Sequence, residues 1–131
     1  MIKKISLYLM ATLYFFAGVN HFIKPEMYKK MIPPFIPYHS LINYTTGFIE
    51  VFLAVLLIIP RTRSFAGKAI MVMLIAFIPV HIYMIYTGWC PGERCTPQWV
   101  LWVRLFVLQP LLIWLAWWVS VRAASHVQKM N

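Results

Sequence analysis

Residues 41–60 read LINYTTGFIEVFLAVLLIIP, an apolar stretch with a glutamate at its midpoint. Three more apolar stretches occupy residues 5–22, 65–86 and 100–121. A helix needs about 20 apolar residues to cross a hydrocarbon core of about 30 Å, and all four stretches are near that length. The sequence therefore predicts an all-α polytopic membrane protein, in which residues 1–131 form one four-helix bundle domain.

The composition excludes an ordinary soluble domain. Of the 131 residues, 62% are hydrophobic and 11% are charged, whereas soluble domains average about 25% charged residues. The formal net charge of +9 comes mostly from residues between and beyond the apolar stretches. We interpret this charge as a topology signal and an attraction to anionic headgroups. We expect the lipid bilayer to be a partner of the chain and expect no nucleic-acid binding.

The distribution of basic residues predicts the orientation of the four spans. One face of the membrane holds seven of them, namely Lys3, Lys4, Arg61, Arg63, Lys68, Arg122 and Lys129. The opposite face holds four, Lys24, Lys29, Lys30 and Arg94, together with Glu26 and Glu93. Because basic segments favour the cytoplasm, we expect an inner or plasma membrane protein with both termini cytoplasmic. The two lysines before the first span could also begin a secretory signal peptide, but no small-residue cleavage pattern follows them.

The two connections on the outer side differ in character. Residues 23–40 contain four prolines. Within them, residues 26–31 are expected to form a short interfacial helix, and residues 31–39 a proline-stiffened lid. The later connection contains Cys90 and Cys95, and an oxidising compartment favours a disulfide between them. Their C-x4-C spacing differs from the C-x-x-C of thioredoxin-like redox centres, so a structural clip is preferred over a catalytic dithiol.

The second span carries small or polar residues at three- and four-residue steps, namely Asn43, Thr46, Gly47 and Glu50. Residues with this spacing share one face of a helix, and we expect that face to point into the bundle. A carboxylate in the middle of a membrane costs about 2.5–3.5 kcal/mol. Glu50 therefore needs a proton or an internal partner.

The other three spans supply candidate partners at similar depth. The first span ends with Asn20 and His21, His81 lies in the outer third of the third span, and Arg104 lies near the start of the fourth. Together with Glu50, these residues are predicted to form a site in the outer half of the bundle that binds a small molecule or relays protons. The alternative is a structural role, in which Arg104 extends to the headgroups or an ion pair fixes the helix register. The histidines lack a metal-ligand spacing, so no metal site is expected.

Prolines are expected to shape the third and fourth spans. Pro79 and Pro110 each remove a helical hydrogen bond and favour a kink. Thr96 and Pro97 are expected to begin the fourth helix, as its N-cap and its first-turn proline.

Three segments together resemble one known family. The runs AGVNHFIKPEMYKKMIPPFIPYH, GFIEVFLAVLLIIPRTR and FIPVHIYM are similar to the DoxX-like family of small four-helix membrane proteins. They lie within residues 17–84, so the fourth helix and the cysteine loop stay unmatched. The resemblance implies a four-helix membrane fold and a link to redox chemistry, because the family is named after a subunit associated with thiosulfate:quinone oxidoreduction. MauE and the receptor-assembly chaperone NACHO are distant relatives, which implies that functions vary within this fold.

The first function compatible with these features is a redox-linked subunit of a membrane oxidoreductase complex. Its cofactor would be a quinone or a similar apolar ligand in the outer half of the bundle. His21 or His81 would bind the head of this ligand. Glu50 would relay a proton, and Arg104 would fix the charge of Glu50. Whether the chain is itself catalytic stays open.

The second function is a non-enzymatic assembly factor or scaffold. The outer connection rich in methionine and proline would then contact a membrane or peripheral protein partner, or a second copy of the chain. Met27, Met31 and Met84 would provide an adaptable contact surface.

Overall fold

The computed structural model describes the backbone of residues 1–129 and the side chains of residues 1–120 and Lys129. Within residues 1–129 the regular elements are all helical, and they follow the chain as α1 (Ile2–Ile23), α2 (Pro25–Lys29), α3 (His39–Ile58), α4 (Arg63–Ala76), α5 (Ile78–Thr87), α6 (Gln98–Val103), the π-helical segment η1 (Arg104–Leu108) and α7 (Gln109–Gln128). The expectation of an all-α fold is confirmed.

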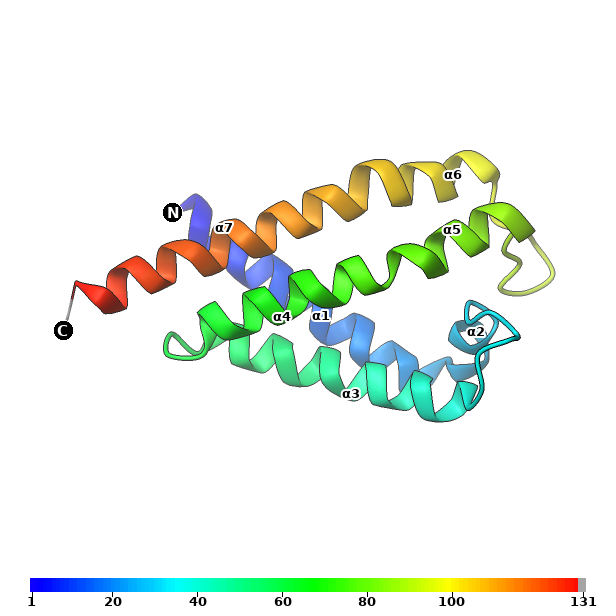
Figure 1. Cartoon of the computed structure of the whole chain (residues 1–131), viewed down its shortest axis with the longest axis horizontal. Coiled ribbons are helices and arrows are strands. Elements are labelled where there is room, and N and C mark those ends of the chain that lie inside the picture. Colours follow the sequence, from blue (N-terminus) through cyan, green and yellow to red (C-terminus); the bar gives the residue numbers. More distant parts are fainter. Residues whose placement is uncertain (130–131) are drawn as a thin grey trace.

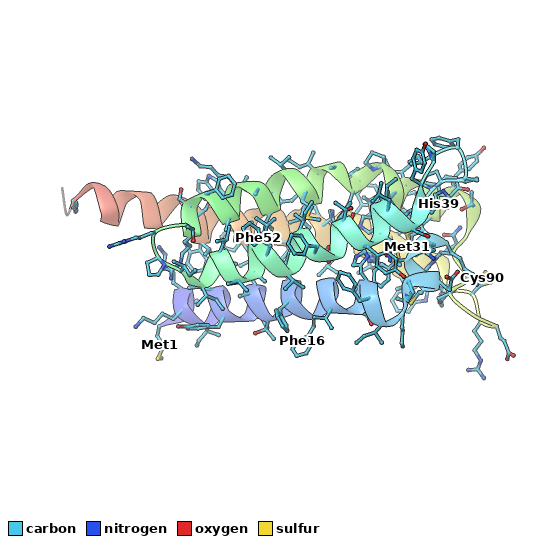
Figure 2. All side chains as sticks on the ribbon, turned by 90° about the horizontal axis from the view of Figure 1, so that it is seen from below. Met1, Phe16, Met31, His39, Phe52 and Cys90 are labelled. Carbon is cyan, nitrogen blue, oxygen red and sulfur yellow. A yellow bond between two sulfur atoms is a disulfide. The ribbon has the colours of Figure 1, made fainter. Side chains whose placement is uncertain are left out.

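Four helical stretches are long and apolar enough to cross a membrane, namely Ile2–Ile23, His39–Ile58, Arg63–Thr87 and Gln98–Ser120. Each overlaps one predicted span, with small shifts at the ends. The outer surface of the bundle fits this property, because large apolar side chains such as Phe16 and Phe52 project away from it (Figure 2).

The helices run back and forth between two ends of an elongated bundle (Figure 1). One end holds the N-terminus, the α3–α4 turn and the last described residues, and we call it the basic end. The other holds α2 and the loop of residues 88–97, and we call it the disulfide end, because Cys90 and Cys95 form a disulfide there. Across the bundle, α1 packs on α3, and α4 packs on α7. The predicted Cys90–Cys95 pairing is therefore present.

The α1–α3 pair is held at a crossing of two glycines. A Cβ atom on Gly18 would lie 2.7 Å from the carbonyl oxygen of Gly47, and one on Gly47 would lie 2.6 Å from the Cβ of His21. Neither distance is compatible with a real side chain, so the close approach of α1 and α3 requires glycine at both positions. This crossing places His21 beside the polar face of α3.

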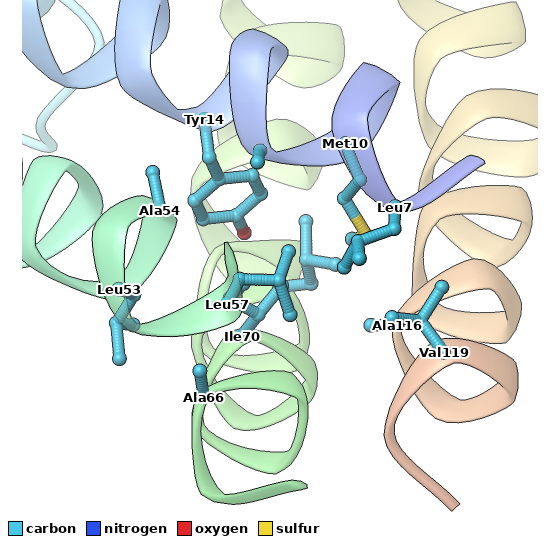
Figure 3. Close-up of a cluster of buried hydrophobic side chains, with 12 residues drawn as sticks. Leu7, Met10, Tyr14, Leu53, Ala54, Leu57, Ala66, Ile70, Ala116 and Val119 are labelled. Carbon is cyan, nitrogen blue, oxygen red and sulfur yellow. The ribbon is translucent and has the colours of Figure 1, made fainter. Parts of the chain in front are cut away.

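The basic half of the bundle contains a large apolar cluster, drawn in Figure 3. Its buried members come from all four spanning helices and are Leu7, Met10, Ala11, Tyr14, Leu53, Ala54, Leu57, Ala66, Ile70, Leu74, Ala116 and Val119. Leu57 and Ile70 are fully buried in it. Small residues on α4 and α7 allow close packing there, because a Cβ on Gly67 would lie 3.0 Å from the carbonyl oxygen of Ala116.

The disulfide half contains a smaller cluster, which consists of Met31, Met84 and Leu101 with four partly buried neighbours. Met31 and Met84 are only 8% and 1% exposed. The prediction that these two methionines form a contact surface is therefore wrong, since both fill the interior instead. The short helix predicted within residues 26–31 is present as α2, and Lys29 Nζ lies 3.0 Å from Glu26 Oε1 on its surface.

Both predicted proline positions coincide with irregular helix geometry. The third span divides into α4 and α5 at Phe77, just before Pro79, and the fourth span contains η1 just before Pro110. The N-cap prediction for Thr96 is wrong, because α6 begins at Gln98 with Pro97 as its N-cap. The Thr96 N–H instead donates to the carbonyl oxygen of Trp89 at 2.8 Å, which closes the disulfide loop.

Candidate ligand-binding site

A cavity of about 270 Å³ lies between the two apolar clusters. It is bounded by Tyr14 and Leu74 of the large cluster and by Met31 of the small one. All four spanning stretches contribute to its wall, and Ile32 and Ile36 from the α2–α3 connection also line it. The segment predicted as a lid, residues 31–39, therefore covers part of the cavity.

Most of the lining is apolar, and the polar residues on it are His21, Tyr28, Asn43, Thr46, Glu50, His81, Arg104 and Gln109, with Tyr14 at the base. The set includes His21, Glu50, His81 and Arg104, one from each spanning stretch, as the sequence predicted. The structure thus brings four ionisable groups to one cavity. Their role in ligand binding or proton transfer stays a prediction.

Two of the predicted site residues lie outside the cavity lining. Gly47 takes part in the helix crossing with Gly18. Asn20 is turned towards α2, where its Nδ2 donates to the hydroxyl oxygen of Tyr28 at 2.8 Å. Asn20 therefore acts on the cavity only by fixing Tyr28.

Asn43 determines which nitrogen of His21 carries a proton. The Asn43 Nδ2 donates to the carbonyl oxygen of His21 at 3.0 Å, so its Oδ1 is the atom that lies 2.7 Å from His21 Nδ1. An amide oxygen only accepts, which means that His21 Nδ1 bears the hydrogen and donates it. In the neutral ring, Nε2 then holds the lone pair, and this atom faces Glu50.

Glu50 is a buried polar group of the cavity with unused hydrogen-bonding capacity. Its Oε2 lies 3.5 Å from His21 Nε2, its side chain is 8% exposed, and Oε2 has no hydrogen-bond partner among the described residues. A neutral His21 and an ionised Glu50 would place two acceptors face to face. The pair therefore holds at least one proton, on the carboxyl group or on the ring, and Oε2 remains open to a further partner.

Tyr28 packs against the ring of His21 in the His21–Glu50 pair. Its ring stacks on the ring of His21, with centroids 3.8 Å apart and an angle of 26° between the planes. Tyr28 was not predicted from the sequence, although a short helix was expected there, because the sequence of a five-residue helix does not show which of its sides faces the bundle. Tyr28, Asn43 and the glycine crossing together hold His21 in one orientation.

Arg104 faces the cavity without the partner predicted for it. Among the described residues, the ion pair of Glu50 is with His21, and Arg104 forms no ion pair or hydrogen bond. The prediction that Arg104 fixes the charge of Glu50 is therefore wrong. The guanidinium lies in electrostatic range of His81 and Tyr28 instead. The cavity thus offers an acceptor at Glu50 and an unused cationic donor at Arg104.

Gln109 is a cavity residue that the sequence analysis missed. Its Nε2 donates to the carbonyl oxygen of Leu74 at 2.6 Å, in a buried hydrogen bond between α7 and α4. The available signal was an amide side chain in the middle of an apolar span, directly before Pro110. Such a group is costly to bury without a partner, so it could have been expected to bond to another helix.

Within residues 1–129 the fold and the cavity define a small all-helical protein, in which four helical stretches long and apolar enough to cross a membrane surround a mostly apolar cavity that carries several polar groups. The family model described as "Domain of unknown function (DUF8561)" matches residues 10–120, and the chain belongs to this family. The matched range includes all cavity residues discussed above. No curated protein and no solved structure matches the chain.

Proposed function

We propose that the chain is a DoxX-like integral membrane protein whose cavity binds a quinone or a similar ring-headed apolar ligand, as a redox-linked subunit of a membrane oxidoreductase complex. The observation that carries the proposal is the buried Glu50 Oε2, which forms no hydrogen bond with the described residues although it lies 3.5 Å from His21 Nε2, and which borders a mostly apolar cavity. Buried polar atoms without a hydrogen bond are rare in proteins and need an explanation. A bound ligand that donates to Oε2 supplies one.

The dimensions of the cavity suit a substituted ring. A protein cavity of about 150 Å³ holds a benzene molecule, and this cavity measures about 270 Å³. The extra volume accommodates ring substituents and polar oxygens. The apolar lining provides favourable contacts for the ring faces, while Glu50 and Arg104 provide different polar anchors.

The two anchors match the two redox forms of a quinone. Glu50 Oε2 would accept a hydrogen bond from a quinol hydroxyl, and the guanidinium of Arg104 would donate to a quinone carbonyl oxygen. Interconversion of the two forms moves two electrons and two protons. The Glu50–His21 pair would exchange one of these protons with the ligand, and His81, which also lines the cavity, would exchange the other. The electrons would pass to or from a redox partner protein of the complex.

The proposed orientation places both termini in the cytoplasm and the disulfide end on the outer side of an inner or plasma membrane. The bias of basic residues towards the basic end supports this orientation. The Cys90–Cys95 disulfide supports it independently, because such bonds persist in oxidising compartments. The cavity then lies in the outer half of the membrane.

The proposed function is tested by isolating the protein in native lipid and identifying bound small molecules and proteins by mass spectrometry. We expect a quinone and a redox-active membrane or peripheral protein to co-purify. We also expect the purified chain to be stabilised against heat by an added decyl-substituted benzoquinone. Absence of any quinone from the preparation, together with no stabilisation by the added compound, would contradict the proposal.

An assembly factor or scaffold is the second candidate, and exposed aromatic side chains at the disulfide end favour it. Phe35 is 80% exposed and Tyr86 is 90% exposed, and exposed aromatic residues commonly contact partner proteins. For this function, changing Phe35 and Tyr86 to serine abolishes partner binding while Glu50→Gln leaves it intact. Loss of function from Glu50→Gln alone would rule the scaffold out.

A further inference from the structure

A second hollow lies on the outer surface of the bundle, at the same level as part of the cavity. It is an apolar groove of about 400 Å³ between the α4–α5 stretch on one side and η1 and α7 on the other. Its lining includes Met71, Ile78, Leu105, Ile113, Trp114 and Trp117. Trp114 and Trp117 are about half exposed, so the groove is open on the side that would face lipid.

The groove and the cavity share one residue, Gln109. This side chain is 4% exposed, and its hydrogen bond to the Leu74 carbonyl oxygen crosses from α7 to α4 between the two hollows. Leu74 lines the cavity on the inner side of this bond, while Met71 lines the groove one turn away along α4. Gln109 therefore borders both the cavity and the groove, and its hydrogen bond joins α7 to α4 at this boundary.

The backbone is irregular on both sides of this separation. α4 ends at Ala76, two residues after Leu74, and η1 ends at Leu108, directly before Gln109. Interrupted and π-helical segments occur frequently at functional sites in membrane helices. Here both interruptions lie within two residues of Leu74 or Gln109, the two residues joined by the hydrogen bond between α4 and α7.

We propose that the hydrocarbon tail of the ligand passes beside Gln109 and lies in this groove, while the ring occupies the cavity. This inference rests on the proposed function. A cavity that fits a ring has no room for a long tail, so the tail has to leave it. The groove shares Gln109 with the cavity, and its other lining residues are apolar or aromatic. A further hollow shares Ile36 with the cavity, but His39 and Ser40 also line it, so it suits a hydrocarbon tail less well. The open side of the groove would let a ligand arrive from the bilayer without crossing water.

The test compares two probes on three proteins. The probes are a dimethoxy-methyl-benzoquinone without a tail and its decyl-substituted analogue. The proteins are the wild type, Ile113→Trp, which fills the groove, and Leu111→Trp, which adds the same bulk at an exposed residue outside the groove. Affinities are measured by calorimetry in lipid nanodiscs of one fixed composition.

We expect Ile113→Trp to weaken binding of the decyl compound by about tenfold, the loss that follows when two buried methylene groups are displaced. Binding of the tail-free compound is unchanged in all three proteins, and Leu111→Trp behaves as the wild type with both probes. Equal affinities of the wild type and Ile113→Trp for the decyl compound overturn the inference alone. Failure of the wild type to bind either probe overturns the proposed function as well.

Cross-linking gives a second readout that does not need the variant to fold. A decyl analogue with a diazirine at the end of the tail is photoactivated in nanodiscs with the wild-type chain. We expect cross-links at Met71 and Ile113 that an excess of the unlabelled decyl compound abolishes. Labelling at these residues that persists under competition, at the level given by a diazirine phospholipid, means that bulk lipid occupies the groove, and it overturns the inference.

Discussion

The two halves of the bundle contain the same four long helical stretches but differ in how tightly their interiors are packed. In the basic half, glycine and alanine bring α4 and α7 together, and the interior is closed by leucine and isoleucine. In the disulfide half, the same stretches continue as α5 and α6 after irregular segments, and the interior contains a cavity bordered by Glu50 Oε2, which forms no hydrogen bond with the described residues. The difference indicates that the tighter packing lies in one half and the cavity proposed to bind a ligand in the other.

The largest expected effect comes from truncating the core of the basic half. Leu57 is fully buried, so Leu57→Ala should reduce the free energy of unfolding by about 2–5 kcal/mol. Leu108 borders the cavity and is 43% exposed, so Leu108→Ala removes fewer contacts and should cost clearly less. Reversible unfolding in mixed detergent micelles measures both. Equal losses for the two variants would show that the halves do not differ in packing.

An intermediate loss of stability is expected from a change at the glycine crossing of α1 and α3. Gly47→Ala places a methyl group against the Cβ of His21, and overpacking of this kind costs about 1–3 kcal/mol. Because His21 has to move, quinone affinity should fall together with stability. The matched control is Gly92→Ala in the disulfide loop, where the added methyl group meets open space. Titration and thermal unfolding are compared for both variants, and unchanged quinone affinity in Gly47→Ala would contradict the assigned role of the crossing.

The most local effect is expected from Asn43→Ala, which changes the tautomer of one ring. It also leaves the buried His21 carbonyl oxygen without its side-chain partner, at a cost of about 1 kcal/mol in the free energy of unfolding. Without the Asn43 amide oxygen, His21 should no longer hold its hydrogen on Nδ1 alone, and the nitrogen NMR shifts of its ring should move towards a mixture of tautomers. His39 is an internal reference, because its Nε2 faces the Pro33 carbonyl oxygen at 3.2 Å and therefore bears the hydrogen in the neutral ring. An unaltered His21 spectrum would show that Asn43 does not set the tautomer.

Much of this architecture could be predicted from the sequence. The length of an apolar stretch indicates a helix that can cross a membrane, and the spacing of polar residues indicates which of them share one face of that helix. Both rules located the helices and placed Glu50 on an inward face. The depth of His21, His81 and Arg104 along their helices was also sufficient to predict that they lie near one another.

The features that could not be predicted depend on how each helix is rotated about its axis and on how far its side chains extend towards a neighbouring helix. Depth alone favoured Arg104 as the partner of Glu50, but the glycine crossing brings α1 so close to α3 that His21 takes that place. The buried positions of Met31 and Met84 follow from how the outer connection folds back over the bundle, and no short-range pattern encodes this. Gln109 was missed because its partner is a backbone carbonyl on another helix.

The central claim is that Glu50 receives a hydrogen bond from a quinone-type ligand in the cavity. The most direct measurement is the affinity of the decyl-substituted benzoquinol for the wild type, for Glu50→Gln and for Glu26→Gln, a control at the exposed surface of α2. Glutamine keeps an oxygen acceptor but removes its charge, and a hydrogen bond to a charged group is stronger than one to a neutral group. We therefore expect an affinity about tenfold lower for Glu50→Gln, with Glu26→Gln equal to the wild type. Equal affinity of all three proteins would contradict the account.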